Sequence, residues 1–155
     1  MDISLIVNPV SNPVPVVGLS NIVTIANAVV ITDTAIHDFD IITHGGMTES
    51  QIRQYKNFKI SINNTHNQVC TASLYTAVAS IGSPTSANGA GTLYSEANNI
   101  VASSGKLVLA SGVGGTGSTL KVVPTLQGIH SNLIVRLTYA VAPTSGSITI
   151  KIEMN

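Results

Sequence analysis

Two stretches near the C-terminal end of the chain alternate apolar and polar residues with a period of two. Within residues 133–141 the odd-numbered positions are Leu, Val, Leu, Tyr and Val, and within residues 148–154 the even-numbered positions are Ile, Ile, Ile and Met. Successive side chains of a β-strand point to opposite faces of a sheet, so this pattern predicts two strands, each with one buried face. Between them lies the turn-forming sequence APTSG, residues 142–146, which predicts a hairpin.

The register of this hairpin stays open at the level of sequence. Two registers keep both apolar faces on the same side of the sheet. One places Arg136 opposite Glu153, which the opposite charges favour. The other places Arg136 near Lys151 but leaves room for a four-residue turn.

A second hairpin is predicted for residues 58–77. Apolar and polar residues alternate over residues 58–63, the polar run 63–68 forms a turn, and alternation resumes over residues 69–77. The positions expected to face the interior are Phe58, Ile60, Ile62, Cys70, Ala72 and Leu74.

Shorter elements complete the expected secondary structure. Further strands are predicted at residues 29–32, 36–43, 106–110 and 119–123, the last of them stopped by Pro124. Two short helices are also predicted. One follows the capping box TESQ at residues 48–51, and the other is indicated by the helical spacing of Leu93, Ala97, Ile100 and Val101.

Many short strands separated by turns, in 155 residues rich in Val, Ile and Thr, predict one all-β domain. A chain of this length buries about two-thirds of its unfolded surface and needs no metal or disulfide to fold. We therefore expect an antiparallel β-sandwich, jelly-roll or immunoglobulin-like, over residues 21–155. Residues 82–91, rich in Ser, Gly, Asn and Pro, are expected to form a long exposed loop.

Residues 1–20 are expected to form an extended N-terminal arm. The sequence NPVSNPVPVV at residues 8–17 contains three prolines, which fix their own φ and keep the preceding residues extended. Such an arm lies in a groove of another subunit, or it leads as a strand into the domain's own sheet. For the first alternative, the predicted interface residues are Val10, Pro13, Val14, Pro15 and Val16.

The charge content narrows the range of partners. Only 9% of the residues are charged, against about 25% in typical domains, and seven basic residues balance seven acidic ones. The basic residues are scattered, which argues against nucleic acid. The apolar stretch at residues 22–31 is too short to cross a membrane. A surface so poor in charge suits a subunit of an assembly better than a lone monomer.

For three candidate chemical motifs, the neighbouring sequence argues against a catalytic or binding role. The sequence GVGGTG at residues 112–117 matches a dinucleotide-binding loop, but a strand-like segment follows it instead of a helix. The stretch with His37, Asp38, Asp40 and His44 could hold a cation, yet a charged strand edge explains it better. Single Cys70 is expected to be buried and structural, and His66 and His130 lie in or beside turns without ligand-type spacing. We expect no catalysis, no cofactor and no metal.

Residues 55–75 resemble a pattern in virion proteins of tailed bacteriophages, in which an aromatic-led strand ends in an Asn-rich turn before a second strand. The NPVPV sequence at residues 12–16 and the Pro-Thr-Ser-Gly loop before the last strand are similar to such proteins too. The resemblance covers under half of the chain.

The resemblance implies a structural subunit of a virion, made in the host cytoplasm. Its function would be capsid decoration at the seams between subunits, or an accessory place in a head fibre or tail. Its partners would be capsid or tail proteins and further copies of itself, with a trimer favoured. The alternative is a carbohydrate- or cell-surface-binding module of a fibre or tail. That alternative needs exposed aromatic residues, and the chain offers Tyr55, Tyr75 and Tyr94 but no Trp.

Overall fold

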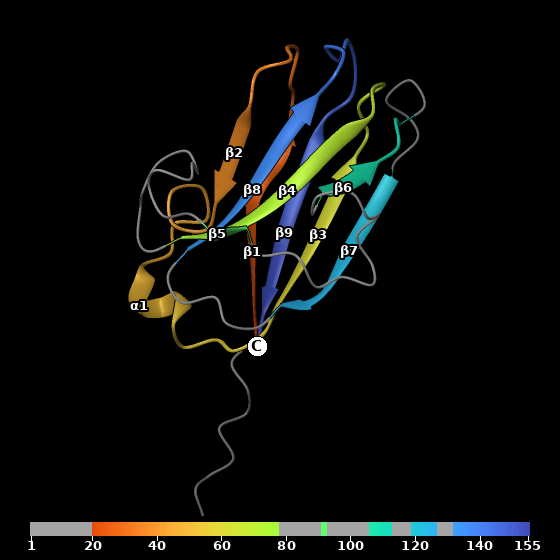
Figure 1. Ribbon diagram of the computed structural model, residues 1–155. Coiled ribbons are helices and arrows are strands. Elements are labelled where there is room, and N and C mark those ends of the chain that lie inside the picture. Colours follow the sequence, from red (N-terminus) through yellow and green to blue (C-terminus); the bar gives the residue numbers. More distant parts are fainter. Residues whose placement is uncertain (1–19, 78–90, 93–105, 113–118, 127–131) are drawn as a thin grey trace, which may run out of the picture.

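A computed structural model of the chain describes residues 20–77, 91–92, 106–112, 119–126 and 132–155 (Figure 1). These residues are mostly β-structure, with one very short helix. The elements are, in chain order, β1 (Asn21–Val29), β2 (His37–Asp40), α1 (Glu49–Ile52), β3 (Phe58–Asn64), β4 (Cys70–Ala77), β5 (Gly91–Thr92), β6 (Lys106–Leu109), β7 (Thr119–Leu126), β8 (Asn132–Tyr139) and β9 (Ile148–Met154).

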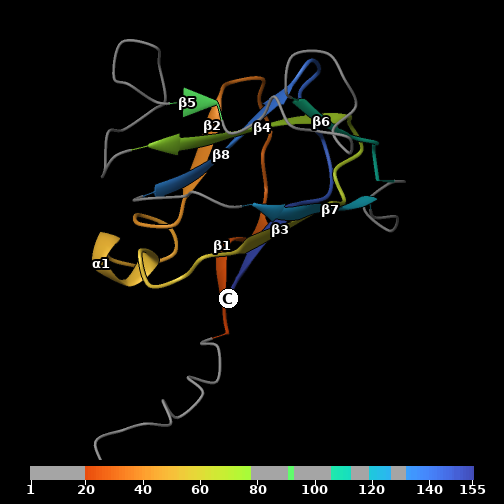
Figure 2. The same ribbon diagram turned by 60° about the horizontal axis from the view of Figure 1, so that its bottom comes forward.

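The strands form two antiparallel sheets. The first sheet has the order β1-β9-β3-β7, and the second has the order β2-β8-β4-β5 with β6 also paired to β4. The two sheets lie as separate layers in Figure 2. One cluster of buried residues draws side chains from both sheets, so the core lies between the layers.

Strand alternation fills this core as the sequence predicted. In β3 and β9 every second residue is buried, and the residues between them point outward. The inward positions predicted for β4 and β8 are buried as well. The exception is Val141, the last residue of the alternation over residues 133–141, which lies beyond the end of β8 and is exposed. The fully buried members include Phe58, Ile60, Ile62, Cys70, Ala72, Leu74, Leu133, Val135, Leu137, Ile148, Ile150, Ile152 and Met154.

Both predicted hairpins are wrong. Strands β3 and β9 belong to the first sheet, whereas β4 and β8 belong to the second. The loops after β3 and β8 therefore carry the chain from one layer to the other. Neither register considered for Arg136 occurs, because this residue pairs with Asp38 of β2 and Ser73 of β4. A strand buries the same apolar face whether the next strand pairs with it in a hairpin or lies in the opposite sheet. Alternation of apolar and polar residues therefore could not distinguish the two arrangements.

The first strand also differs from expectation. Residues 29–32 were predicted as a strand, but β1 runs from Asn21 to Val29 and pairs with β9. Its register shifts twice, and Ala28 takes a positive φ of 49°. Each β-bulge moves the alternation by one residue, which hides the strand from a period-two pattern. The strand predicted at residues 36–43 is shorter as β2, because a turn begins after Asp40.

Strand β7 continues to Leu126, so the prediction that Pro124 ends it is wrong. Proline lacks an N–H and is tolerated in a sheet only at an edge or a bulge. Both conditions hold here: β7 is the last strand of its sheet, and its register with β3 shifts between Val123 and Leu126.

The predicted capping box of α1 is confirmed. The Thr48 side chain accepts a hydrogen bond from the Gln51 N–H, and the Gln51 side chain accepts one from the Thr48 N–H. The helix indicated by Leu93, Ala97, Ile100 and Val101 lies outside the described residues.

The chain passes between the layers mainly at one end of the molecule, at the top of Figure 1. There β1 is joined to β2, β3 to β4, and β8 to β9, and the residues that follow β6 also lie there. We call this region the arch end and define it as residues 30–36, 65–69, 110–112 and 140–147.

Candidate functional site

The loop after β3 is the centre of the arch end. Thr65 binds the backbone of Ser147 through three hydrogen bonds: its N–H and its hydroxyl donate to the Ser147 carbonyl at 2.9 and 3.0 Å, and its hydroxyl accepts from the Ser147 N–H at 2.8 Å. Asn67 binds Thr144 in the same loop through two more. The Gly112 N–H donates to the carbonyl of His66. One short segment therefore ties the loops after β6 and β8 together.

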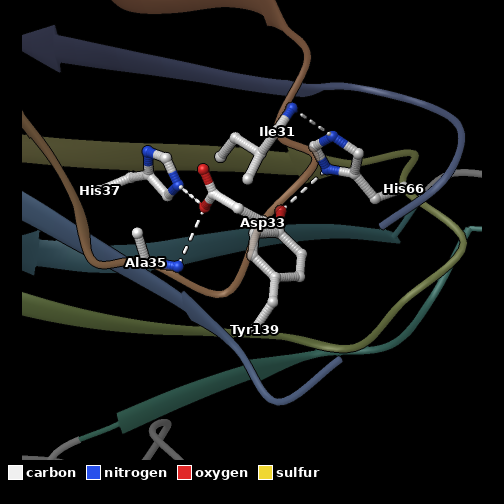
Figure 3. Close-up of polar contacts among 6 residues, drawn as sticks. All are labelled: Ile31, Asp33, Ala35, His37, His66 and Tyr139. Atoms are coloured by element: carbon white, nitrogen blue, oxygen red, sulfur yellow. Dashed lines mark hydrogen bonds and ion pairs between the residues drawn. The ribbon is translucent and has the colours of Figure 1, made fainter. Parts of the chain in front are cut away.

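The side chain of His66 ties in the loop after β1 (Figure 3). This imidazole is fully buried, its Nε2 lies 3.2 Å from the Ile31 N–H, and its Nδ1 lies 2.8 Å from the Tyr139 hydroxyl. An amide N–H only donates, so Nε2 is the acceptor and the proton sits on Nδ1. The Tyr139 hydroxyl accepts the hydrogen bond from Nδ1 and donates one to the side-chain Oδ1 of Asn64 at 3.5 Å.

This network holds His66 in its neutral form. Burial lowers the pKa of His66, since a charged imidazolium loses its hydration inside the protein. Asn64 completes the network by donating to the carbonyls of Gln68 and Ala110, both at 3.0 Å. Apart from the Asn64–Gln68 contact, these hydrogen bonds join segments that are far apart in sequence, so the network fixes the shape of the arch end.

Cys70 is buried beside this network, as predicted for a structural cysteine. Burial raises the pKa of its thiol to about 11. Burial also raises the pKa of Tyr139, whose hydroxyl interacts with the thiol. Because the thiolate is the reactive form, a thiol that stays protonated at neutral pH is a poor nucleophile.

The acidic and histidine-containing stretch around β2 does not converge on one point. Asp38 forms a two-pronged ion pair with Arg136, at 2.8 and 2.9 Å, with both side chains less than one-fifth exposed. This pair raises the pKa of Arg136. His37 instead contacts Asp33 at 2.7 Å, and that hydrogen bond is the main reason why the pKa of Asp33 is lowered (Figure 3).

Asp40 and His44 stabilise the turn after β2 by accepting hydrogen bonds from its backbone. The Asp40 carboxylate accepts a hydrogen bond from the Thr43 N–H at 2.7 Å, and His44 Nδ1 accepts one from the Asp40 N–H at 3.1 Å. Within the described ranges, no three His, Cys, Asp or Glu side chains are placed to hold a metal ion. Strand β2 is an edge strand, which agrees with the strand-edge interpretation, although Asp38 is less exposed than that interpretation implied.

Exposed aliphatic side chains gather at the arch end, and sequence analysis missed them. Val30, Ile36, Val69 and Val141 are between 49% and 65% exposed and come from three of the loops that the His66 segment holds together. Val141 had been predicted to face the core. It lies two residues beyond the end of β8, and because the apolar alternation continues as far as Val141, the sequence holds no signal of its exposure.

Several predicted features lie outside the described residues: the interface residues Val10, Pro13, Val14, Pro15 and Val16, residues 82–90 of the predicted exposed loop 82–91, His130 and Tyr94. The last residue of that predicted loop, Gly91, begins strand β5 instead. Of the other tyrosines considered for sugar stacking, Tyr55 is half-buried and packs against the core. The Tyr75 ring lies 5.3 Å from the guanidinium carbon of Arg136. The strand predicted after the GVGGTG sequence is present as β7, which begins at Thr119, while residues 113–117 of that sequence lie outside the described residues.

No protein-family model matches the chain, and a search of curated proteins finds no match either. Among the described residues, no helix is long and apolar enough to cross a membrane.

Proposed function

We propose that this chain is a non-enzymatic structural subunit of a phage-like virion, most simply a decoration protein that binds at seams between capsid subunits. The placement in a virion rests on the sequence resemblance of residues 55–75 and of the Pro-rich segment to virion proteins. The structure contributes two supporting observations, the order of the strands and the character of the arch end.

The strand order favours a jelly roll over an immunoglobulin-like sandwich. Without the two-residue β5, the chain places β1, β9, β3 and β7 in one sheet and β2, β8, β4 and β6 in the other. Immunoglobulin sheets keep some consecutive strands as neighbours, whereas in the eight strands described here each consecutive pair except β4 and β6 is split between sheets. Jelly rolls occur in viral capsid and lectin domains, so the support for a virion role is by analogy of fold.

The surface of the arch end is the observation that carries the proposal. Its described loops contain one acidic residue, Asp33, and no Lys or Arg, and they expose four large aliphatic side chains. Desolvating charged groups is costly, so the centres of protein–protein interfaces are poor in charge. An aliphatic end that is poor in charge and cross-linked by the His66 network suits contact with another protein surface. It does not suit phosphate, which needs clustered cations.

Particles purified from the source culture on a density gradient test the proposal. The full-length chain is expected to co-sediment with them at a constant ratio to the main shell protein. Val69→Asp and Val141→Asp should weaken this attachment, because each places a charge on the apolar surface. Gln54→Asp, at an exposed position beyond α1, is the matched control and should attach normally. If all three variants attach equally well, the arch end is not the contact surface; if the chain stays in particle-free fractions, the proposed function is wrong.

A further inference from the structure

The outer face of the first sheet carries a hollow beside the start of β1. Cross-strand pairing puts Ile22 next to Glu153, which in turn lies next to Lys59; one row further on, Lys151 lies next to Ser61. Ser61 is short and its neighbours are long, so their side chains surround a depression of about 200 Å³. It is lined by Ile22, Lys59, Ile60, Ser61, Lys151 and Glu153.

The walls of this hollow are aliphatic and its rim is charged. Ile22 is 64% exposed. The long stems of Lys59 and Lys151 offer further apolar surface while their ammonium groups stay in water. A cavity of about 150 Å³ holds benzene, whereas small-molecule sites occupy about 300–1,000 Å³. The hollow is therefore of the size for one or two aliphatic side chains of a peptide.

The N-terminal segment of the chain has the matching chemistry. Residues 3–19 contain no charged residue, and residues 8–17 contain three prolines and four valines. If residues 10–16 bind as a β-strand, Val10, Val14 and Val16 would share one side, because every second side chain of a strand points the same way. Fully extended, 19 residues reach up to about 65 Å, which is ample to leave one molecule and cross the face of another.

The place of this segment in the chain favours the hollow of a second copy over that of its own molecule. Its last residue precedes β1, whose first residues border the hollow of the same molecule. To enter that hollow, the segment would have to reverse direction completely within residues 17–20. The segment is long enough to reach the hollow of a second copy without such a reversal.

We propose that the hollow binds valine side chains of residues 10–16 from the N-terminal segment of a second copy of this chain. The inference rests on the proposed function, since it names the partner through which the subunit assembles. Each copy has one segment and one hollow, so two copies can exchange segments in a two-fold dimer, or copies can join head-to-tail in a ring where the rotation closes. A trimer is the simplest such ring that agrees with the expected assembly.

Full-length variants test the exchange by light scattering after size-exclusion chromatography. Ile22→Asp places a charge in the apolar wall of the hollow, and Val14→Asp combined with Val16→Asp places charges on the segment. We expect the wild type to be an oligomer and each of these variants to be a monomer. Mixed in equal amounts they should form a dimer, because one supplies an intact segment and the other an intact hollow. Asn27→Asp, on an exposed part of β1 away from the hollow, is the control and should keep the wild-type mass.

Circular dichroism and cooperative urea unfolding identify variants that have not folded, and Ser61→Trp is a second way to fill the hollow. A mixture that stays monomeric, or hollow variants that keep the wild-type mass, would overturn the exchange. A monomeric wild type would show that the segment does not join two copies. If the mixture forms a dimer but the chain does not attach to particles, the exchange stands and the virion role is wrong. If the chain attaches to particles as a monomer, the virion role stands and the exchange is wrong.

Discussion

Replacing Gly146 by Ala tests how tightly the arch end is built. Gly146 has a φ of 89°, and a Cβ at this position would lie 2.1 Å from the Thr65 carbonyl oxygen. The positive φ costs an alanine about 1–2 kcal/mol. The backbone of residue 65 must also move, which weakens three hydrogen bonds to Ser147 worth about 1 kcal/mol each. We expect the free energy of unfolding to fall by about 3–5 kcal/mol.

Gly46→Ala is a matched control, because Gly46 also has a positive φ, 67°, but no atom lies within 4 Å of the added Cβ. It should cost about 1–2 kcal/mol, the price of the φ alone. Urea unfolding followed by circular dichroism measures both free energies, and unchanged slopes would show that the two variants are compared on the same transition. If Gly146→Ala costs no more than Gly46→Ala, the close contact with the loop after β3 is not as described.

Three further predictions concern the buried polar groups. Tyr139→Phe should lower the free energy of unfolding by about 1–3 kcal/mol, because His66 loses the acceptor for its Nδ1 proton; a loss within urea-titration error would contradict the network. The lowered pKa of His66 means that the unfolded chain takes up a proton first, so stability should hold above pH 6.5 and fall below it by at most about 1.4 kcal/mol per pH unit. Unfolding measured between about pH 7.5 and about pH 5.5 should show this slope in the wild type and less of it in His66→Gln; equal slopes would assign it to other groups. Asp38→Asn should cost about 1–3 kcal/mol, because it leaves the guanidinium of Arg136 partly buried without its counter-charge. Glu49→Gln removes the more exposed ion pair between Glu49 and Arg53 at the end of α1 and should cost less than about 0.5 kcal/mol. Similar costs for Asp38→Asn and Glu49→Gln would show that burial does not strengthen the Asp38–Arg136 ion pair.

Local pattern was enough to assign faces to the strands but not to assign their partners. The inward residues of β3 and β9 follow from alternation alone. The partner of Arg136 does not, because Asp38 lies 98 positions away in sequence and local alternation does not show which strands pair. In β1, two bulges interrupt the alternation and hide the strand. The jelly-roll and immunoglobulin-like alternatives differ only in such long-range pairings, which is why the sequence left both open.

The same limit applies to the arch end. His66 was identified only as a turn residue, because nothing near it in sequence reveals its role. Its two partners, Ile31 and Tyr139, lie 35 and 73 positions away. The burial of Cys70 was predictable, since it occupies an inward position of a recognisable strand. The exposed aliphatic residues of the arch end could be recognised only once the strand ends were known. An apolar residue just beyond a strand continues the same alternation as an apolar residue inside it.

Electron cryomicroscopy of particles purified from the source culture tests subunit packing most directly. We predict density for the two-sheet domain at equivalent seams of the shell, with the arch end turned toward the shell subunits. Complete shells without density for this chain, from a culture in which the chain is produced, would contradict its role as a structural subunit of the virion.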